Sequence, residues 1–204
     1  MTNHLLIFTR YPKPGKTKTR LIPAVGPEGA ATIQRELTEH TIQTVRSLQA
    51  RLPELVSTVF YTGTTQQQMA AWLGSDLQYR PQGEGNLGQR MQASFQAAFA
   101  MGAKRVVIIG IDCPELAVTD LEQAFIALSK QAIVFGPATD GGYYLLGQQH
   151  LVPELFVNVE WGTDQVLAQS LAIATQLNLT VQQLRPLTDI DRPADLPLWE
   201  QLRG

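Results

Sequence analysis

The sequence predicts an α/β fold in which helices cover both faces of a mostly parallel sheet. Short apolar runs rich in valine and isoleucine, which are typical of buried strands, occur at residues 5–8, 55–60, 106–111 and 132–135. Longer segments with helical periodicity separate these runs, and this alternation indicates parallel strands joined by helices. The chain has 204 residues, 44% hydrophobic and 17% charged, which suits one core. We therefore expect residues 1–204 to form a single domain.

The helices are predicted from apolar periodicity and from capping signals. Residues 28–51, which follow Pro27, place apolar side chains on roughly one face of a long helix. Capping signals mark further helices, because a polar side chain there accepts hydrogen bonds from the backbone of the first turn. These signals are Asn86 with Gln89, Thr119 with Glu122, Thr163, and Asp191 followed by Pro193.

Composition excludes several classes of function. The formal net charge of −2 gives no overall field that would favour nucleic acid or an anionic membrane. The one cysteine, Cys113, excludes an internal disulfide and a multi-cysteine zinc site, and the three histidines are scattered. No leader-like apolar segment and no apolar run long enough to span a bilayer occur, so we expect a cytoplasmic protein. The sequence does not indicate an oligomeric state.

Positive charge is concentrated in one short segment. Of 16 basic residues, five lie in residues 10–20, so eleven basic and 18 acidic residues remain, a formal charge of −7. The five are Arg10, Lys13, Lys16, Lys18 and Arg20. Such a block is either a solvated, flexible stretch or a stiff loop that binds anions. Pro12, Pro14 and Gly15 favour the stiff loop, as does its position after the first predicted strand.

Two familiar glycine motifs do not fit their usual roles. Residues 15–17 (Gly-Lys-Thr) resemble the end of a P-loop, but Arg10 stands where that motif requires its first glycine. Residues 83–88 match G-x-G-x-x-G, but the preceding residues are polar and interrupted by Pro81 rather than forming a hydrophobic strand. A dinucleotide site is therefore not expected, although these glycines would allow the backbone to approach a ligand closely.

Acidic residues follow the later predicted strands. Asp112 comes directly after the run 106–111, at the strand end where α/β folds bind ligands, and its carboxylate could hold a hard cation such as Mg²⁺. The alternative is that Asp112 only caps a turn. The neighbouring Cys113 is interpreted as a small packed residue rather than a nucleophile.

Two further aspartates have both a structural and a functional interpretation. Asp140 follows the run 132–135 and begins Asp-Gly-Gly, which is a common turn. Gly141 and Gly142 would equally suit contact with a sugar or phosphate, and residues 143–146 are expected to begin a strand beside the same cleft. Asp191 either caps the C-terminal helix or supplies a second metal ligand. Together with the basic loop, these carboxylates suggest a site for a metal-diphosphate complex.

Four segments in order resemble one known family. They are residues 8–21 (FTRYPKPGKTKTRL), 82–91 (QGEGNLGQRM), 110–114 (GIDCP) and 140–145 (DGGYYL). The chain is identified by them as similar to the radical-SAM/selenodomain-associated transferases, or arsenosugar-biosynthesis-type glycosyltransferases, formerly a domain of unknown function. This family resembles the nucleotide-diphospho-sugar transferase superfamily, which implies a three-layer GT-A-like fold with a mostly parallel mixed sheet. The Lys18–Leu21 element also resembles that of molybdenum-cofactor and phospholactate guanylyltransferases.

The resemblance assigns roles to matching residues. It implies that Lys18 and Arg20 bind nucleotide phosphates and that Asp112 is the metal-binding aspartate. Two features depart from the pattern. The first loop is rich in proline and lysine where nucleotidyltransferases have glycines, and a single Asp112 stands where many glycosyltransferases have Asp-x-Asp.

The sequence therefore predicts a complete set of site residues. The catalytic residue is Asp140; the nucleotide and phosphate ligands are Arg10, Lys16, Lys18, Arg20, Gly85 and Asn86; the substrate ligands are Gly141, Gly142 and Tyr143; and the metal ligands are Asp112 and Asp191. The expected cofactor is Mg²⁺ or Mn²⁺, and the partners are a nucleotide or nucleotide-sugar and a small-molecule acceptor. The predicted function is glycosyl transfer from a nucleotide-sugar. The alternatives are a nucleotidyltransferase that releases pyrophosphate from an NTP and a nucleotide-binding module without catalysis.

Overall fold

A seven-stranded sheet forms the centre of the computed structural model, which describes residues 2–203. Its strand order is β3-β2-β1-β4-β6-β5-β7. The strands are β1 (Asn3–Arg10), β2 (Val56–Thr62), β3 (Gln78–Pro81), β4 (Arg105–Ile109), β5 (Ile133–Pro137), β6 (Tyr143–Gln148) and β7 (Val181–Gln183). Only β6 runs antiparallel to its neighbours, so the expectation of a mostly parallel mixed sheet is confirmed.

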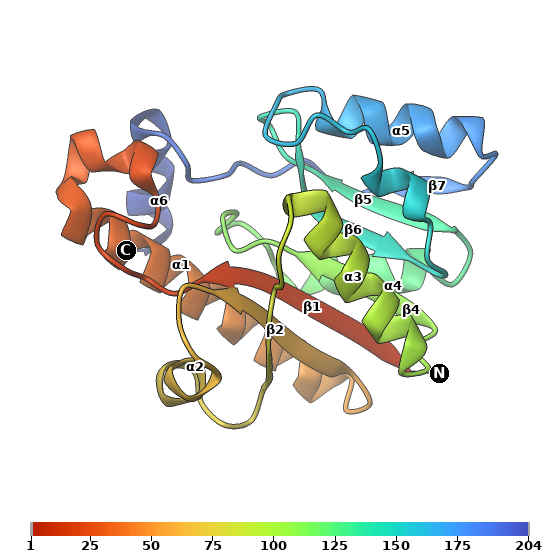
Figure 1. Ribbon diagram of the computed structural model, residues 1–204, viewed down its shortest axis with the longest axis horizontal. Coiled ribbons are helices and arrows are strands. Elements are labelled where there is room, and N and C mark those ends of the chain that lie inside the picture. Colours follow the sequence, from red (N-terminus) through yellow and green to blue (C-terminus); the bar gives the residue numbers. More distant parts are fainter. Residues whose placement is uncertain (1, 204) are drawn as a thin grey trace.

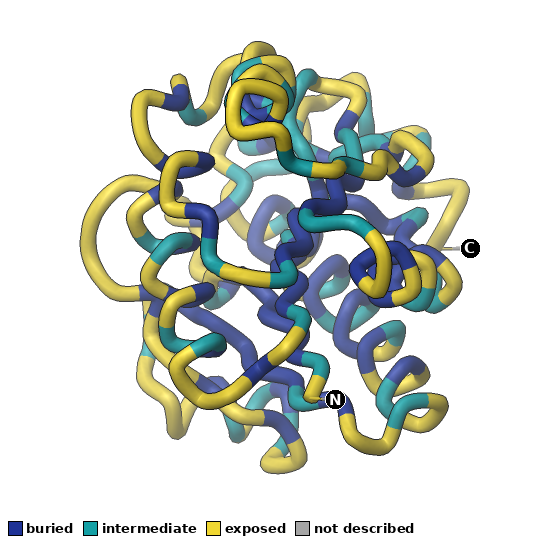
Figure 2. The backbone as a smooth tube through the Cα atoms, turned by 90° about the vertical axis from the view of Figure 1, so that its right-hand side faces the viewer, coloured by how far each residue is buried: buried dark blue, intermediate teal, exposed yellow. Residues whose placement is uncertain are grey.

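Helices cover both faces of this sheet and create three layers (Figure 1). Successive side chains of β1 point to opposite faces, so Leu5 and Ile7 join one core while Leu6 and Phe8 join the other. The first core also takes side chains from α1 (Ile22–Arg51), α2 (Gln66–Leu73), α4 (Val118–Ala127) and α6 (Leu196–Arg203). The second core takes them from α3 (Leu87–Ala100) and α5 (Val166–Gln176). Figure 2 shows buried segments at the centre of the molecule, with mostly exposed segments around them.

The predicted strands correspond to β1, β2, β4, β5 and β6, but three elements were not predicted. The edge strand β3 contains one buried residue, Tyr79, and β7 contains none, so neither shows a strong apolar run. The short helix α2 buries only Met69 and Leu73. Such elements depend on their neighbours in the fold more than on their own sequences.

The long predicted helix and one of the predicted caps are confirmed. Helix α1 is interrupted at Gly26, whose φ of 71° lies outside the helical region, so its regular part begins at Pro27 as the sequence indicated. Asn86 caps α3 and forms a reciprocal capping box with Gln89. This box fixes the first turn of α3, which lies beside the candidate site.

Three predicted caps were wrong. Thr119 lies inside α4, where the carboxylate of Asp120 instead accepts a hydrogen bond from the Ala117 N–H at 2.9 Å. Two residues separate Thr163 from the start of α5. Its hydroxyl accepts a hydrogen bond only from the Gln165 N–H, which lies before the helix, so it does not cap the first turn. Asp191 is not a cap, because the carboxylate of Asp195 accepts from both the Asp191 and Arg192 N–H groups. The side chain of Asp191 is thereby left available for another role.

A crossover segment, residues 184–192, connects β7 to α6 and passes the carboxyl ends of the strands (Figure 1). Backbone hydrogen bonds tie it to β5 through Leu184 and Leu187, and to the segment after β4, where the Ile190 N–H donates to the backbone carbonyl oxygen of Asp112 at 2.8 Å. Arg185 anchors it to α4 through two 2.8 Å hydrogen bonds to the buried carboxylate of Asp120. These contacts bring the aspartates of the crossover segment to the same edge as Asp112.

Within residues 2–203, no helix is both long and apolar enough to cross a lipid bilayer.

We predict that Asp120→Asn destabilises the fold by about 2 kcal/mol, because it weakens charge-assisted hydrogen bonds to a buried acceptor. Asp76→Asn is the matched control, since Asp76 also receives two hydrogen bonds from one arginine, Arg46, but is exposed. Its loss is expected to stay below about 1 kcal/mol. Urea unfolding measures both variants, and equal losses would show that the Arg185 anchor contributes no more than a surface ion pair.

Candidate functional site

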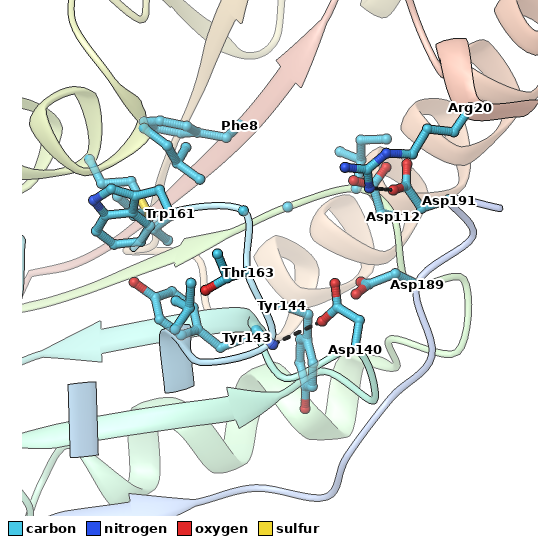
Figure 3. Close-up of a pocket in the computed structure, with 18 residues that line it drawn as sticks. Phe8, Arg20, Asp112, Asp140, Tyr143, Tyr144, Trp161, Thr163, Asp189 and Asp191 are labelled. Atoms are coloured by element: carbon cyan, nitrogen blue, oxygen red, sulfur yellow. Dashed lines mark hydrogen bonds and ion pairs between the residues drawn. The ribbon is translucent and has the colours of Figure 1, made fainter. Parts of the chain in front are cut away.

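A pocket of about 430 Å³ opens at the carboxyl edge of the sheet, where the sequence predicted a site. Its two ends differ in chemistry (Figure 3). Four carboxylates line one end: Asp112, Asp140, Asp189 and Asp191. Apolar and aromatic side chains line the other end: Phe8, Leu87, Met91, Tyr143 and Trp161. Carboxyl edges of this kind are the usual ligand sites of open α/β sheets.

The basic loop meets the acidic end of the pocket through Lys18. Its side chain is only 4% exposed, and its Nζ lies 2.6 Å from Asp112 Oδ1 and 2.5 Å from the Ile190 carbonyl oxygen. The backbone of Lys18 is in the left-handed region, with φ at 47°, a conformation that residues other than glycine adopt at an energetic cost. The loop and the strand-end aspartate therefore converge, and the surrounding fold holds Lys18 in a strained position to achieve it.

A second ion pair lies beside the first. Arg20 Nη1 donates to Asp191 Oδ2 at 2.5 Å, and both side chains are partly exposed (Figure 3). Two of the five cations in the basic segment are thus paired with carboxylates of the pocket. In the part of the chain that the structure describes, the other three, Arg10, Lys13 and Lys16, have no ion-pair partner.

Asp189 is a pocket residue that the sequence analysis missed. Burial raises its pKa to about 7, and the nearby carboxylates of Asp112 and Asp140 add to the increase. Figure 3 shows the carboxyl groups of Asp140 and Asp189 facing one another. The position of Asp189, two residues before Asp191 in a segment already singled out, was the available signal. A carboxyl group that titrates near neutral pH can exchange a proton with a substrate.

Cys113 supports Asp189 and is not placed to react. Its Sγ donates a hydrogen bond to Asp189 Oδ1 at 2.8 Å, and the residue is buried. Burial, followed by the charge of Asp189, raises the pKa of the thiol, which keeps it protonated. The structure therefore agrees with a packed cysteine rather than a nucleophile.

Asp140 lies in a tight turn whose glycines have different roles. Its Oδ1 accepts from the Gly142 N–H at 2.9 Å, which holds the carboxylate toward the pocket. Gly141 has φ at 91°, and a Cβ there would overlap the backbone of Asp164, so this position requires glycine for packing. Gly142 and Tyr143 line the pocket, whereas Gly141 does not.

The last glycine of the 83–88 motif shapes the apolar end. The motif does follow a strand, the unpredicted β3, but Gly88 packs directly against the indole of Trp161, which a Cβ would overlap. Trp161 in turn meets Tyr143 edge to face, with ring centroids 6.4 Å apart. The Tyr143 hydroxyl is buried and has no hydrogen-bond partner among residues 2–203. Trp161, which lies in no recognised motif, and Phe8, the first residue of the 8–21 segment, were also not predicted as site residues.

The pocket brings together only part of the predicted site. Besides the aspartates, Arg20, Gly142 and Tyr143 line it, and Lys18 reaches it through Asp112. The predicted residues that do not line it are Arg10, Lys16, Gly85, Asn86 and Gly141. Arg10 instead donates to the Lys16 carbonyl oxygen at 3.0 Å, and Asn86 caps α3 beside the lining residue Leu87.

The donor chemistry of the acidic end suits a hard divalent cation. Its four carboxylates exceed the two paired cations, so the pocket has unbalanced negative charge and oxygen ligands. Across residues 2–203, however, no three histidine, cysteine or carboxylate side chains are grouped so as to hold a metal ion. A cation would therefore bind through one or two carboxylates and complete its coordination with water and substrate phosphates, as Mg²⁺ commonly does.

Sequence comparison connects the chain with one family. Residues 44–163 match the family described as "Uncharacterized protein conserved in bacteria (DUF2064)". No curated protein matches the chain.

Solved structures share the fold. A protein from Desulfovibrio desulfuricans G20, provisionally named a nucleotide-diphospho-sugar transferase, superposes with a TM-score of 0.90 at 31% identity, covering 98% of this chain and 87% of that one. CMP:2-keto-3-deoxy-manno-octonic acid synthetase in complex with CTP has a TM-score of 0.58 at 10% identity, covering 100% and 98%. Rv0371c from Mycobacterium tuberculosis H37Rv in complex with manganese has a TM-score of 0.56 at 15% identity, covering 99% and 98%. The sheet, the helical layers and these superpositions confirm the nucleotide-diphospho-sugar transferase fold.

We predict that Asp189 makes stability fall as pH rises from about 4 to about 7. Its folded-state pKa of about 7 exceeds the ordinary value of an aspartate, so in this range the folded protein keeps a proton that the unfolded chain releases. Asp189→Asn imitates the protonated form, and its stability advantage over wild type should grow to at least about 1 kcal/mol by pH 7.

Urea unfolding at several pH values in EDTA measures this difference. Asp76→Asn is the control, because its carboxyl has a lowered pKa in the folded state and titrates below this range. Parallel curves for wild type and Asp189→Asn between pH 4 and 7 would contradict the assignment.

Proposed function

The chain belongs to the DUF2064 family of bacterial proteins and, proceeding from that family and its fold, we propose that it is a transferase that uses a nucleotide-sugar donor. The observation that carries this proposal is the meeting of Lys18 and Asp112 at the acidic end of the pocket. A cation side chain and a carboxylate at one strand edge can together hold a diphosphate and its counterion. The apolar end of the same pocket then receives a second group.

Lys18 and Arg20 are proposed to hold the phosphates of the donor. Lys18 Nζ carries three N–H donors and uses two of them, for Asp112 and the Ile190 carbonyl. Arg20 uses one of its five N–H donors, for Asp191. The contacts of Lys18 with Asp112 and Ile190 orient its remaining donor, and the free donors of Arg20 lie at the same end of the pocket, so both side chains can stabilise charge on a departing nucleoside diphosphate.

Mg²⁺ or Mn²⁺ is the proposed cofactor, with Asp112 as the main ligand and Asp191 as the second. A divalent cation bound there would neutralise the diphosphate and make it a better leaving group. The manganese complex of Rv0371c supports this proposal, because that protein shares the fold. To bind the cation, the Asp191 carboxylate must either break its ion pair with Arg20 or keep that ion pair with one oxygen while the other oxygen binds the cation.

Asp140 and Asp189 are the proposed groups for handling the acceptor's proton. Asp140 is oriented by the Gly142 N–H, and Asp189 has a pKa near 7, which suits removal of a hydroxyl proton as the sugar is transferred. Trp161 and Tyr143 provide aromatic surface for the apolar face of a sugar ring, and the unpartnered Tyr143 hydroxyl can bond one of its oxygens. An arsenosugar-type glycosyltransferase is the specific activity that this arrangement, with the motif resemblance, favours.

A nucleotidyltransferase is the second candidate. One observation favours it. Arg10, Lys13 and Lys16 have no ion-pair partner within residues 2–203, so the basic loop carries uncompensated positive charge that could bind a triphosphate. CMP:2-keto-3-deoxy-manno-octonic acid synthetase, a synthetase of the same fold, was solved with CTP.

Substrate consumption separates the candidates. We expect incubation with UDP- and GDP-sugars, acceptors and Mn²⁺ to release nucleoside diphosphate, which supports glycosyl transfer. Pyrophosphate release from an NTP and a sugar phosphate would instead show nucleotidyl transfer. Thermal stabilisation by nucleotide without turnover of any pair would indicate a binding module and contradict both transferase proposals.

We predict that Asp112→Asn weakens Mg²⁺-dependent binding of nucleoside diphosphate at least about tenfold, because it removes the main charged ligand. In EDTA the variant and wild type should bind the nucleotide within about twofold of each other. The amide oxygen and the Ile190 carbonyl still accept from Lys18, so the fold should survive, as the thermal midpoint will show. Asp76→Asn controls for the change in net charge, and unchanged affinity of Asp112→Asn in Mg²⁺ would refute the metal assignment.

A further inference from the structure

Arg90 is held in an unusual place beside the carboxyl end of β1. It lies in the first turns of α3 but reaches back, donating from Nη1 to Gln82 Oε1 at 2.7 Å and from Nε to the Asn86 carbonyl at 3.3 Å. Gln82 is buried, and its Nε2 donates to the carbonyl oxygens of Thr9 and Phe60 at 3.1 and 3.0 Å. The ends of β1 and β2 therefore fix the Gln82 amide, which in turn fixes the Arg90 guanidinium.

Arg10 brings a second guanidinium to the same place. It ends β1, directly after the residue that Gln82 bonds, and its Nη1 is held by the Lys16 carbonyl at 3.0 Å. Burial, and then the charge of Arg10, lower the pKa of Arg90, so the two cations repel one another. No carboxylate among residues 2–203 forms an ion pair with either arginine.

Both side chains keep donors for a ligand. Arg90 Nη2 and the Nε and Nη2 of Arg10 make no hydrogen bond within the described chain. The helix adds to the imbalance, because a cation near the amino end of α3 opposes the macrodipole. A half-buried guanidinium with a like charge nearby and no acidic partner would be stabilised further by a bound anion.

We propose that Arg10 and Arg90 form an oxyanion subsite for a phosphate group, separate from the carboxylates of the pocket. The planar guanidinium group matches the geometry of phosphate oxygens and binds them through charge-assisted hydrogen bonds. Neither arginine lines the pocket, but Leu87 and Met91, which flank Arg90 on α3, do, so the subsite adjoins the apolar end.

The subsite adds a phosphate ligand to the proposed function. Anion binding by the two arginines does not depend on that function; only the assignment of the anion to a transferase substrate rests on it. The phosphate belongs either to a nucleotide or to a phosphorylated acceptor. Unlike the Asp112 site, the arginines require no metal, so binding in EDTA tests them independently of the proposed reaction.

The test is titration of the purified protein with inorganic pyrophosphate in EDTA at low salt, followed by calorimetry. We expect wild type to bind and Arg90→Gln to bind at least about tenfold more weakly. Arg80→Gln is the matched control, since this exposed arginine loses the same charge but contacts Met101 at the other end of α3. The control should stay within about twofold of wild type.

Two outcomes would overturn the subsite. They are absence of pyrophosphate binding to wild type, and equal weakening by Arg90→Gln and Arg80→Gln. Thermal melts of each variant establish that it is folded. If Arg90 proves necessary in EDTA while no transferase activity is found, the subsite stands and the proposed function fails.

Competition distinguishes the two sources of phosphate, and either result supports the subsite. If a nucleotide supplies it, ATP, CTP, GTP or UTP will displace pyrophosphate and Arg90→Gln will weaken that nucleotide. If an acceptor supplies it, glucose 1-phosphate will displace pyrophosphate while the nucleotide binds alongside. Failure of every one of these compounds to displace pyrophosphate would contradict a substrate subsite.

Discussion

The ion pair between Lys18 and Asp112 is the interaction on which the candidate site depends. It joins a loop near the start of the chain to the end of a central strand, and the crossover segment closes over it through Ile190. Burying a lysine is unfavourable unless its charge is compensated, and here Asp112 and the Ile190 carbonyl oxygen provide that compensation. The left-handed backbone of Lys18 adds strain, which persists because neighbouring contacts determine its position. Strain and burial at one residue are typical of functional sites.

This interaction divides the basic segment into two halves with different uses. The later cations, Lys18 and Arg20, are paired with carboxylates and serve to place donors at the pocket's acidic end. The earlier cations remain without acidic partners in the described chain, and Arg10 stands beside a further arginine, Arg90. The acidic end thus suits a cation with its phosphates, and the region around β1 suits an additional anion. One short segment of sequence therefore contributes to both of the proposed binding surfaces.

The fold was predictable because its central strands bury both faces and so show continuous apolar runs. Edge strand β3 buries only Tyr79, and its sequence gave no such signal. Within the site, residues directly after strands could be found from the sequence, as Asp112 was. Asp189 and Arg90 were missed, because their importance arises from packing: burial beside other carboxylates shifts the pKa of Asp189, and Gln82 orients Arg90. Capping was mispredicted where another acid, such as Asp195, supplied the acceptor.

A double-mutant cycle of Lys18→Met and Asp112→Asn, read through Mn²⁺-dependent binding of a nucleoside diphosphate, tests the central claim most directly. If both side chains bind one metal-diphosphate complex, their effects should not be additive. The double variant should then lose about 1 kcal/mol or more less binding free energy for the nucleoside diphosphate than the sum of the two single losses. Additive losses, or single variants that bind as wild type does, would contradict a common ligand site formed by the two residues.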